Sequence, residues 1–194
     1  IPRVIPNCHV YLEADTGSGS QETSCFVNLY GDIGRELIPQ MLRLQGMEHL
    51  SSAIERCLKL VDPDLGVWHL GFMLGRAKPI VRLVLCTMKD KADIKGAVLR
   101  LDEKLWNKEI EEILENLDSG NQFNKIVDID ILPDGAVGET VGGEILLKPV
   151  TPTEQQMLFR SDKWQKALEL LRVEGSCDER ISDIERCVFS SLAP

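Results

Sequence analysis

Two aspartates, Asp128 and Asp130, are the residues in this sequence whose type and spacing best fit a chemical site. They alternate with three β-branched residues in the segment 125–132, and a period of two is typical of a strand with one buried face. Their carboxylates then lie on the same strand face, about 7 Å apart, or two residues of strand rise. Because carboxylate oxygens bind divalent cations, we predict Asp128 and Asp130 as metal ligands.

Further polar side chains join this surface if the expected hairpins share one sheet. Strand alternation assigns His9, His69 and Arg82 to the face opposite the apolar residues, and Glu144 begins the strand that returns after Asp130. Imidazoles, a guanidinium and carboxylates can bind a polar ligand or act as acid and base. We therefore predict His9, His69, Arg82 and Glu144 as ligand-binding residues on an open sheet face. The alternative is structural, since a solvated sheet face also carries alternating polar residues and cross-strand ion pairs.

Alternation along the segment 67–74 also decides where the neighbours of His69 point. It assigns Trp68, Leu70 and Phe72 to the apolar face and leaves His69 on the polar one. Cys86 falls on the same face as His69, so a thiol–imidazole pair for nucleophilic catalysis is geometrically allowed. A small thiol at the end of an apolar strand is more often a core residue, and we favour that interpretation.

The known motifs for calcium binding, dinucleotide binding and hydrolytic catalysis do not match this sequence. A calcium loop starting at Asp128 would need oxygen ligands and a glycine where Leu132 and Pro133 stand. The glycines of 135–143 are followed by an expected strand rather than by a helix, so they do not form a dinucleotide loop. The sequence contains no G-x-S-x-G and no H-E-x-x-H pattern.

The positioning elements follow from hydrophobic periodicity and turn residues. Strands are expected at 8–12, 24–30, 67–75, 80–88, 125–132 and 144–148, and helices over 33–60, 93–117, 153–171 and 181–188. Pro39 and Gly46 are expected to divide the first helical region. This order predicts an α+β fold of three successive β-hairpin–helix units, with a mostly antiparallel sheet covered by helices on one face. We expect a single domain over 1–194, with sub-units 1–61, 62–121 and 122–194.

Composition limits the partners. The 194 residues carry 31 acidic and 22 basic side chains, and the net charge of −9 with 5% aromatic residues argues against nucleic-acid binding. Apolar runs are far shorter than the roughly 20 residues that span a bilayer, so we expect no membrane insertion. The six cysteines form no C-x-x-C pair, and buried reduced thiols would place the protein in the cytoplasm.

Two function classes follow from these observations. The favoured one is a non-catalytic domain that binds a protein or a small polar ligand, as part of a larger chain or complex, because the sequence lacks catalytic motifs and does not begin with methionine. A homo-oligomer is also compatible with the apolar C-terminal segment. The alternative is a metal-assisted or acid–base enzyme that acts on a small polar substrate at the open sheet face, with a divalent metal at Asp128 and Asp130.

Overall fold

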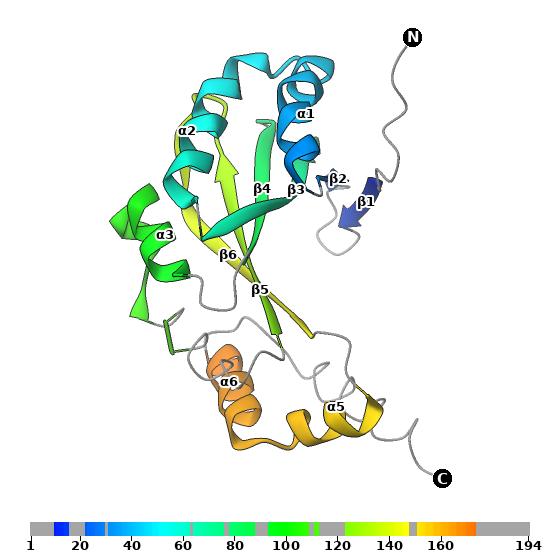
Figure 1. Ribbon diagram of the computed structural model, residues 1–194, viewed down its shortest axis with the longest axis vertical. Helices are drawn as coiled ribbons and strands as arrows, with labels where there is room; N and C mark the ends of the chain where they lie inside the picture. Colours follow the sequence, from blue (N-terminus) through cyan, green and yellow to red (C-terminus); the bar gives the residue numbers. More distant parts are fainter. Residues whose placement is uncertain are drawn as a thin grey trace. The chain divides into compact units, whose positions relative to one another are not determined.

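The computed structural model describes residues 10–15, 22–29, 31–62, 64–75, 78–87, 93–108, 111–112, 123–147 and 151–173 (Figure 1). Six strands form one sheet in chain order, each hydrogen-bonded to the next. They are β1 (Val10–Asp15), β2 (Glu22–Asn28), β3 (Leu65–Met73), β4 (Ile80–Thr87), β5 (Phe123–Ile131) and β6 (Val137–Leu147). The pairs from β1 to β5 are antiparallel. With the helices between and after the strands, the predicted α+β class is confirmed.

The helices lie between and after the strands. They are α1 (Gly31–Leu44), η1 (Glu48–Leu50), α2 (Ser51–Val61), α3 (Ile94–Leu101), η2 (Glu103–Leu105), α5 (Pro152–Phe159) and α6 (Asp162–Val173). Gly46, at φ 69°, separates α1 from η1 and α2 as expected. Pro39, in contrast, lies inside α1, so its predicted helix-breaking role is wrong. The predicted helix over 93–117 is interrupted because Asp102 is extended, and the predicted helix over 181–188 lies outside the described residues.

Contacts group the chain into two compact units. The first comprises residues 1–105 and 125–144, and the second comprises 106–124 and 145–194. The first unit contains most of the sheet together with α1, α2 and α3, and the second contains α5 and α6. The single domain over 1–194 with its three sub-units stays a prediction.

The core of the first unit is built on alternate residues of the central strands. Leu70, Leu83 and Ile129 are fully buried and lie in register across β3, β4 and β5. Helices α1 and α2 contact β3, and α2 also contacts α3. Each aliphatic side chain that is fully buried contributes about 1.5–3 kcal/mol relative to exposure, so this row is a main source of stability.

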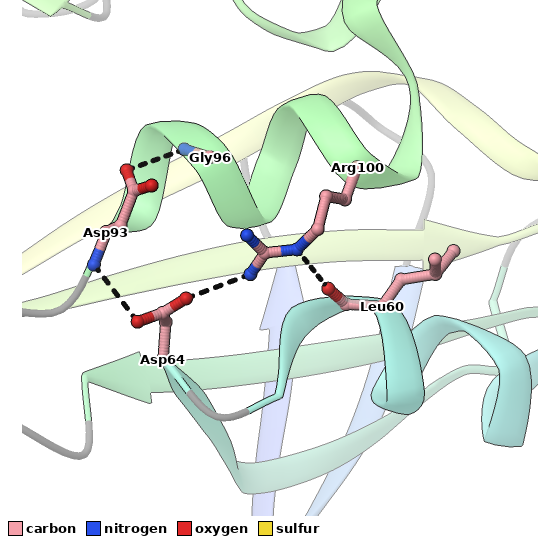
Figure 2. A network of polar contacts seen from close by, with 5 residues as sticks. All are labelled: Leu60, Asp64, Asp93, Gly96 and Arg100. Carbon is pink, nitrogen blue, oxygen red and sulfur yellow. Dashed lines mark hydrogen bonds and ion pairs between the residues drawn. The ribbon is translucent and has the colours of Figure 1, made fainter.

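A polar network connects α3 to the end of α2 in the first unit (Figure 2). The Asp93 carboxylate caps α3 by accepting a bond from the Gly96 N–H at 2.8 Å. Arg100 donates from Nε to the carbonyl of Leu60 at 2.6 Å and pairs through Nη2 with Asp64 at 2.9 Å. The guanidinium therefore satisfies a carbonyl near the C-terminus of α2 and fixes α3 against the turn that leads into β3.

The second unit contains the short helix pair α5 and α6. Thr151 and Glu154 exchange hydrogen bonds at the start of α5 as a capping box, and the bonds from the Thr151 side chain and backbone lower the pKa of Glu154. Phe159 and Trp164 pack edge to face with ring centroids 5.0 Å apart. Leu168 of α6 is also buried. None of the helices in the described ranges has the length and hydropathy that crossing a bilayer requires.

Candidate functional site

Two neighbouring rows of side chains cross one face of the sheet. The first row pairs Asn28, His69, Val84 and Asp128 across β2, β3, β4 and β5. The second row pairs Phe26, Gly71, Arg82 and Asp130 across the same strands. The structure therefore brings His69, Arg82, Asp128 and Asp130 to one face. His9 lies outside the described residues, and for Glu144 only its place in β6 is described.

Arg82 is held by both predicted metal ligands. Its Nε and Nη2 donate to the two carboxylate oxygens of Asp130 at 2.7 and 3.0 Å, and its Nη1 lies 4.0 Å from Asp128 Oδ2. The side chains of Arg82, Asp130 and Asp128 are 25%, 17% and 9% exposed. A bidentate arginine–carboxylate pair of low exposure fixes the geometry of both partners. The cross-strand ion pair considered as the structural alternative is therefore present.

A divalent cation at Asp128 and Asp130 would have to compete with this guanidinium. His69 stands two strands away from Asp128 in the same row, or about 10 Å at ordinary strand spacing, with Val84 between them. Among the described residues, no group of three or more His, Cys, Asp or Glu side chains is placed to hold a metal ion. The metal-binding role of Asp128 and Asp130 stays a prediction.

A β-bulge in β3 changes where Trp68 points. Val67 pairs with Leu85 and His69 with Val84, so Trp68 is an extra residue in β3 that has no counterpart in β4. The Trp68 and His69 rings stack at a centroid distance of 4.9 Å and an interplanar angle of 22°. Trp68 also packs against the cluster of Phe26, Met73, Val84 and Ile126 on this face. Its predicted place on the apolar face with Leu70 is therefore wrong, because the bulge interrupts the period of two.

Tyr11 and Asn28 complete a group around these rings. Tyr11, on the edge strand β1, meets His69 edge to face at a centroid distance of 5.5 Å and is 48% exposed. Asn28 stands opposite His69 in register and is 7% exposed. The backbone N–H of Leu29 donates to the carbonyl of Trp68 at 2.8 Å, which fixes the bulge beside the end of β2. We call Tyr11, Asn28, Trp68 and His69 the Trp68 cluster.

Asn28 and His69 each contribute a buried polar atom to the Trp68 cluster. In the described part of the chain, neither Asn28 Oδ1 nor His69 Nδ1 makes a hydrogen bond. Leaving a buried polar atom without a partner costs about 1–3 kcal/mol, so such atoms require an explanation. Desolvation by burial lowers the pKa of His69, which keeps its imidazole neutral at physiological pH. The site is therefore aromatic, its histidine is neutral, and two of its polar atoms, Asn28 Oδ1 and His69 Nδ1, make no hydrogen bond within the described part of the fold.

Sequence reasoning identified His69 but missed Asn28 and Trp68. Asn28 sits in a strand whose apolar neighbours gave no sign of a site, and the bulge has no marker residue in the sequence.

Cys86 shares this face of the sheet with His69, on β4, but burial raises the pKa of its thiol, which disfavours the nucleophilic thiolate.

A groove runs between α1 and α2, away from the residues predicted for a site. It has a volume of about 540 Å³. Ile38, Ile54 and Leu58 form its floor, and charged side chains such as Glu36 form its rim. Arg35 at one end donates to the Leu58 carbonyl at 3.3 Å, and Lys59 pairs with Glu55 at 2.9 Å. The volume lies in the range of ordinary ligand sites.

No family model matches the chain, and no curated protein or solved structure shows significant similarity to it.

Proposed function

We propose that this protein is a non-catalytic domain that binds a small ligand at the Trp68 cluster. The observation that carries the proposal is Asn28, a buried amide whose Oδ1 atom has no partner and which stands opposite a histidine with an unpaired ring nitrogen. Stacked and edge-on rings beside a few unused polar atoms are the composition of small-molecule sites. A fold gains nothing from such atoms unless something else satisfies them.

The arrangement of layers supports access to this face. We propose that α1, α2 and α3 cover the opposite face of the sheet, where Leu70, Leu83 and Ile129 are fully buried. This leaves Tyr11, on the edge strand and half exposed, at the border of the cluster. We also propose a reducing compartment such as the cytoplasm, since Cys25, Cys57 and Cys86 are free thiols.

The enzymatic alternative is tested by the two aspartates. If Asp128 and Asp130 bound a catalytic metal, the double substitution Asp128→Ala/Asp130→Ala would abolish metal content and turnover. Our proposal predicts a different outcome, since Arg82 already occupies both carboxylates. We expect metal content to be unchanged and stability to fall.

Native mass spectrometry of the untagged protein purified from cells tests the proposal. We compare the wild type with Asn28→Leu, which removes the unpaired amide, and with Ser24→Ala as a matched control. Ser24 lies on the same face of β2 and is equally buried. Wild type and Ser24→Ala are expected to retain a small-molecule mass that Asn28→Leu loses. Identical spectra for all three proteins contradict the proposal.

A second candidate function is docking of a partner protein in the α1–α2 groove. Its occupant would be a short apolar segment with a basic residue beside it. The apolar part fits the floor at Ile54 and Leu58, and the basic residue fits Glu36, for which the described residues provide no ion-pair partner. The net charge of −9 favours a basic partner in addition.

Charge reversal at the groove tests this docking. Glu36→Lys is compared with Glu48→Lys, an exposed substitution outside the groove on η1. Cross-linked partners are mapped by mass spectrometry. Support requires a partner that Glu36→Lys loses and Glu48→Lys keeps, cross-linked through an apolar and basic segment. Equal capture by both variants contradicts groove docking.

A further inference from the structure

We propose that the Trp68 cluster takes an uncharged, planar nitrogen heterocycle that carries an N–H donor in its ring plane, as purines and pyrimidines do. This inference rests on the proposed small-ligand function and specifies the chemical class of the ligand. It follows from three properties of the cluster, which are the shape of its aromatic part, the kind of polar atom left unpaired and the charge around it.

The aromatic part selects a flat ligand. The Trp68 and His69 rings lie face to face at a centroid distance of 4.9 Å, and the Tyr11 and His69 rings meet edge to face at 5.5 Å. Tyr11 stands on the edge strand and is 48% exposed, and we expect the ligand to reach the His69 ring by rotation of the Tyr11 side chain toward solvent. A flat ring placed there stacks on existing rings and immobilises few side chains.

The unpaired atoms select the donor. Asn28 Oδ1 is an acceptor and is satisfied only by an N–H or O–H group. His69 Nδ1, on the residue opposite in register, accepts or donates according to its tautomer. A heterocycle with a ring N–H beside an acceptor nitrogen or carbonyl satisfies both positions at once. An apolar ring satisfies neither.

The surrounding charge selects a neutral molecule. The imidazole of His69 is uncharged at neutral pH because burial disfavours its protonation, so it offers no cation to an anionic ligand. Asp128 stands in the same row of the sheet, and the chain carries a net charge of −9. Arg82 pairs with Asp128 and Asp130 on this face, and its single positive charge is exceeded by their two negative charges, so we expect a phosphate or carboxylate on the ligand to weaken binding. We therefore expect a nucleoside to bind more tightly than its monophosphate.

The test uses a protein in which Trp68 is the only tryptophan, made by Trp106→Phe and Trp164→Phe, both in the second unit. Quenching of Trp68 fluorescence is followed during titration with adenine, uracil, theophylline and caffeine. Theophylline and caffeine form a matched pair, because caffeine has a methyl group where theophylline has its ring N–H. We expect theophylline to bind at least about tenfold more tightly than caffeine, and Asn28→Leu to remove this difference.

Each outcome bears on the inference. Saturable quenching by N–H heterocycles that depends on Asn28 supports it, and weaker binding of adenosine monophosphate than of adenosine supports the neutral class. Equal affinity for theophylline and caffeine, or no saturation with any of the four compounds, overturns it. Tighter binding of single-stranded RNA than of nucleosides also overturns it. If the wild type retains an Asn28-dependent ligand from cells while these heterocycles do not bind, the ligand class is wrong and the small-ligand function remains.

Discussion

Removing Arg82 is the perturbation that best separates a structural from a catalytic role for the polar side chains Arg82, Asp128 and Asp130. In Arg82→Met, the carboxylates of Asp128 and Asp130 lose the guanidinium that lies 4.0 and 2.7 Å from them, while most of the aliphatic volume stays. Breaking a fully buried ion pair by deleting one partner costs about 3–5 kcal/mol. Because Arg82 and Asp130 are 25% and 17% exposed, solvent screens part of this loss, and we expect a cost of about 2–4 kcal/mol.

The assay is urea unfolding followed by far-ultraviolet circular dichroism, combined with a double-mutant cycle. Asp130→Asn alone is expected to be destabilising, and adding it to Arg82→Met is expected to recover part of the loss, since it removes one unpaired charge. The coupling energy between Arg82 and Asp130 should be at least about 1 kcal/mol. The reasoning would be refuted if Arg82→Met lowered the free energy of unfolding by less than about 0.5 kcal/mol, or if the effects of the two substitutions were strictly additive. Either result would favour a ligand-binding role for Arg82.

Three further predictions concern backbone space, protonation and the α3 network. Gly71→Ala would place a Cβ 2.5 Å from Phe26 Cε1 and should lower the free energy of unfolding by about 1–3 kcal/mol. Urea unfolding measures this loss, with Ser24→Ala as the control substitution. Since burial lowers the pKa of His69, the unfolded chain binds a proton at this histidine at a higher pH than the folded protein does. The free energy of unfolding, taken relative to that of His69→Phe, should therefore be constant above pH ~6.5 and should decrease below it. Parallel curves of unfolding free energy against pH for the two proteins would contradict this. Arg100→Met should cost about 1 kcal/mol through loss of the bonds to Leu60 and Asp64, and hydrogen exchange in α3 should increase; unchanged exchange there would contradict the proposed role of the network.

Strand alternation was enough to predict that Arg82 and Asp130 share a face, and the observed register makes them direct partners. The same rule failed at Trp68, because a bulge adds a residue to β3 and brings two consecutive side chains to one face. Bulges depend on how neighbouring strands pair, which a single sequence does not state.

Other differences also come from tertiary context. Strand β6 begins at Val137, earlier than the expected start at Glu144, and its Gly138 and Gly142 lie against Asp130 and Asp128 within the sheet. A Cβ at Gly142 would lie 3.0 Å from that of Asp128, so the close approach of the strands accounts for glycine there. Pro39 is tolerated inside α1 although proline removes a helical donor. Local propensity alone contains none of this information.

The central claim is that Asn28 is present for ligand binding and that the fold does not need its amide. The most direct test is the free energy of unfolding of Asn28→Leu without added ligand. Because the substitution replaces a buried Oδ1 atom that lacks a partner with apolar atoms in the same branched arrangement, we predict that stability is unchanged or increases by about 1–2 kcal/mol. A loss of more than about 1 kcal/mol would show that the amide stabilises the fold, and it would contradict the claim.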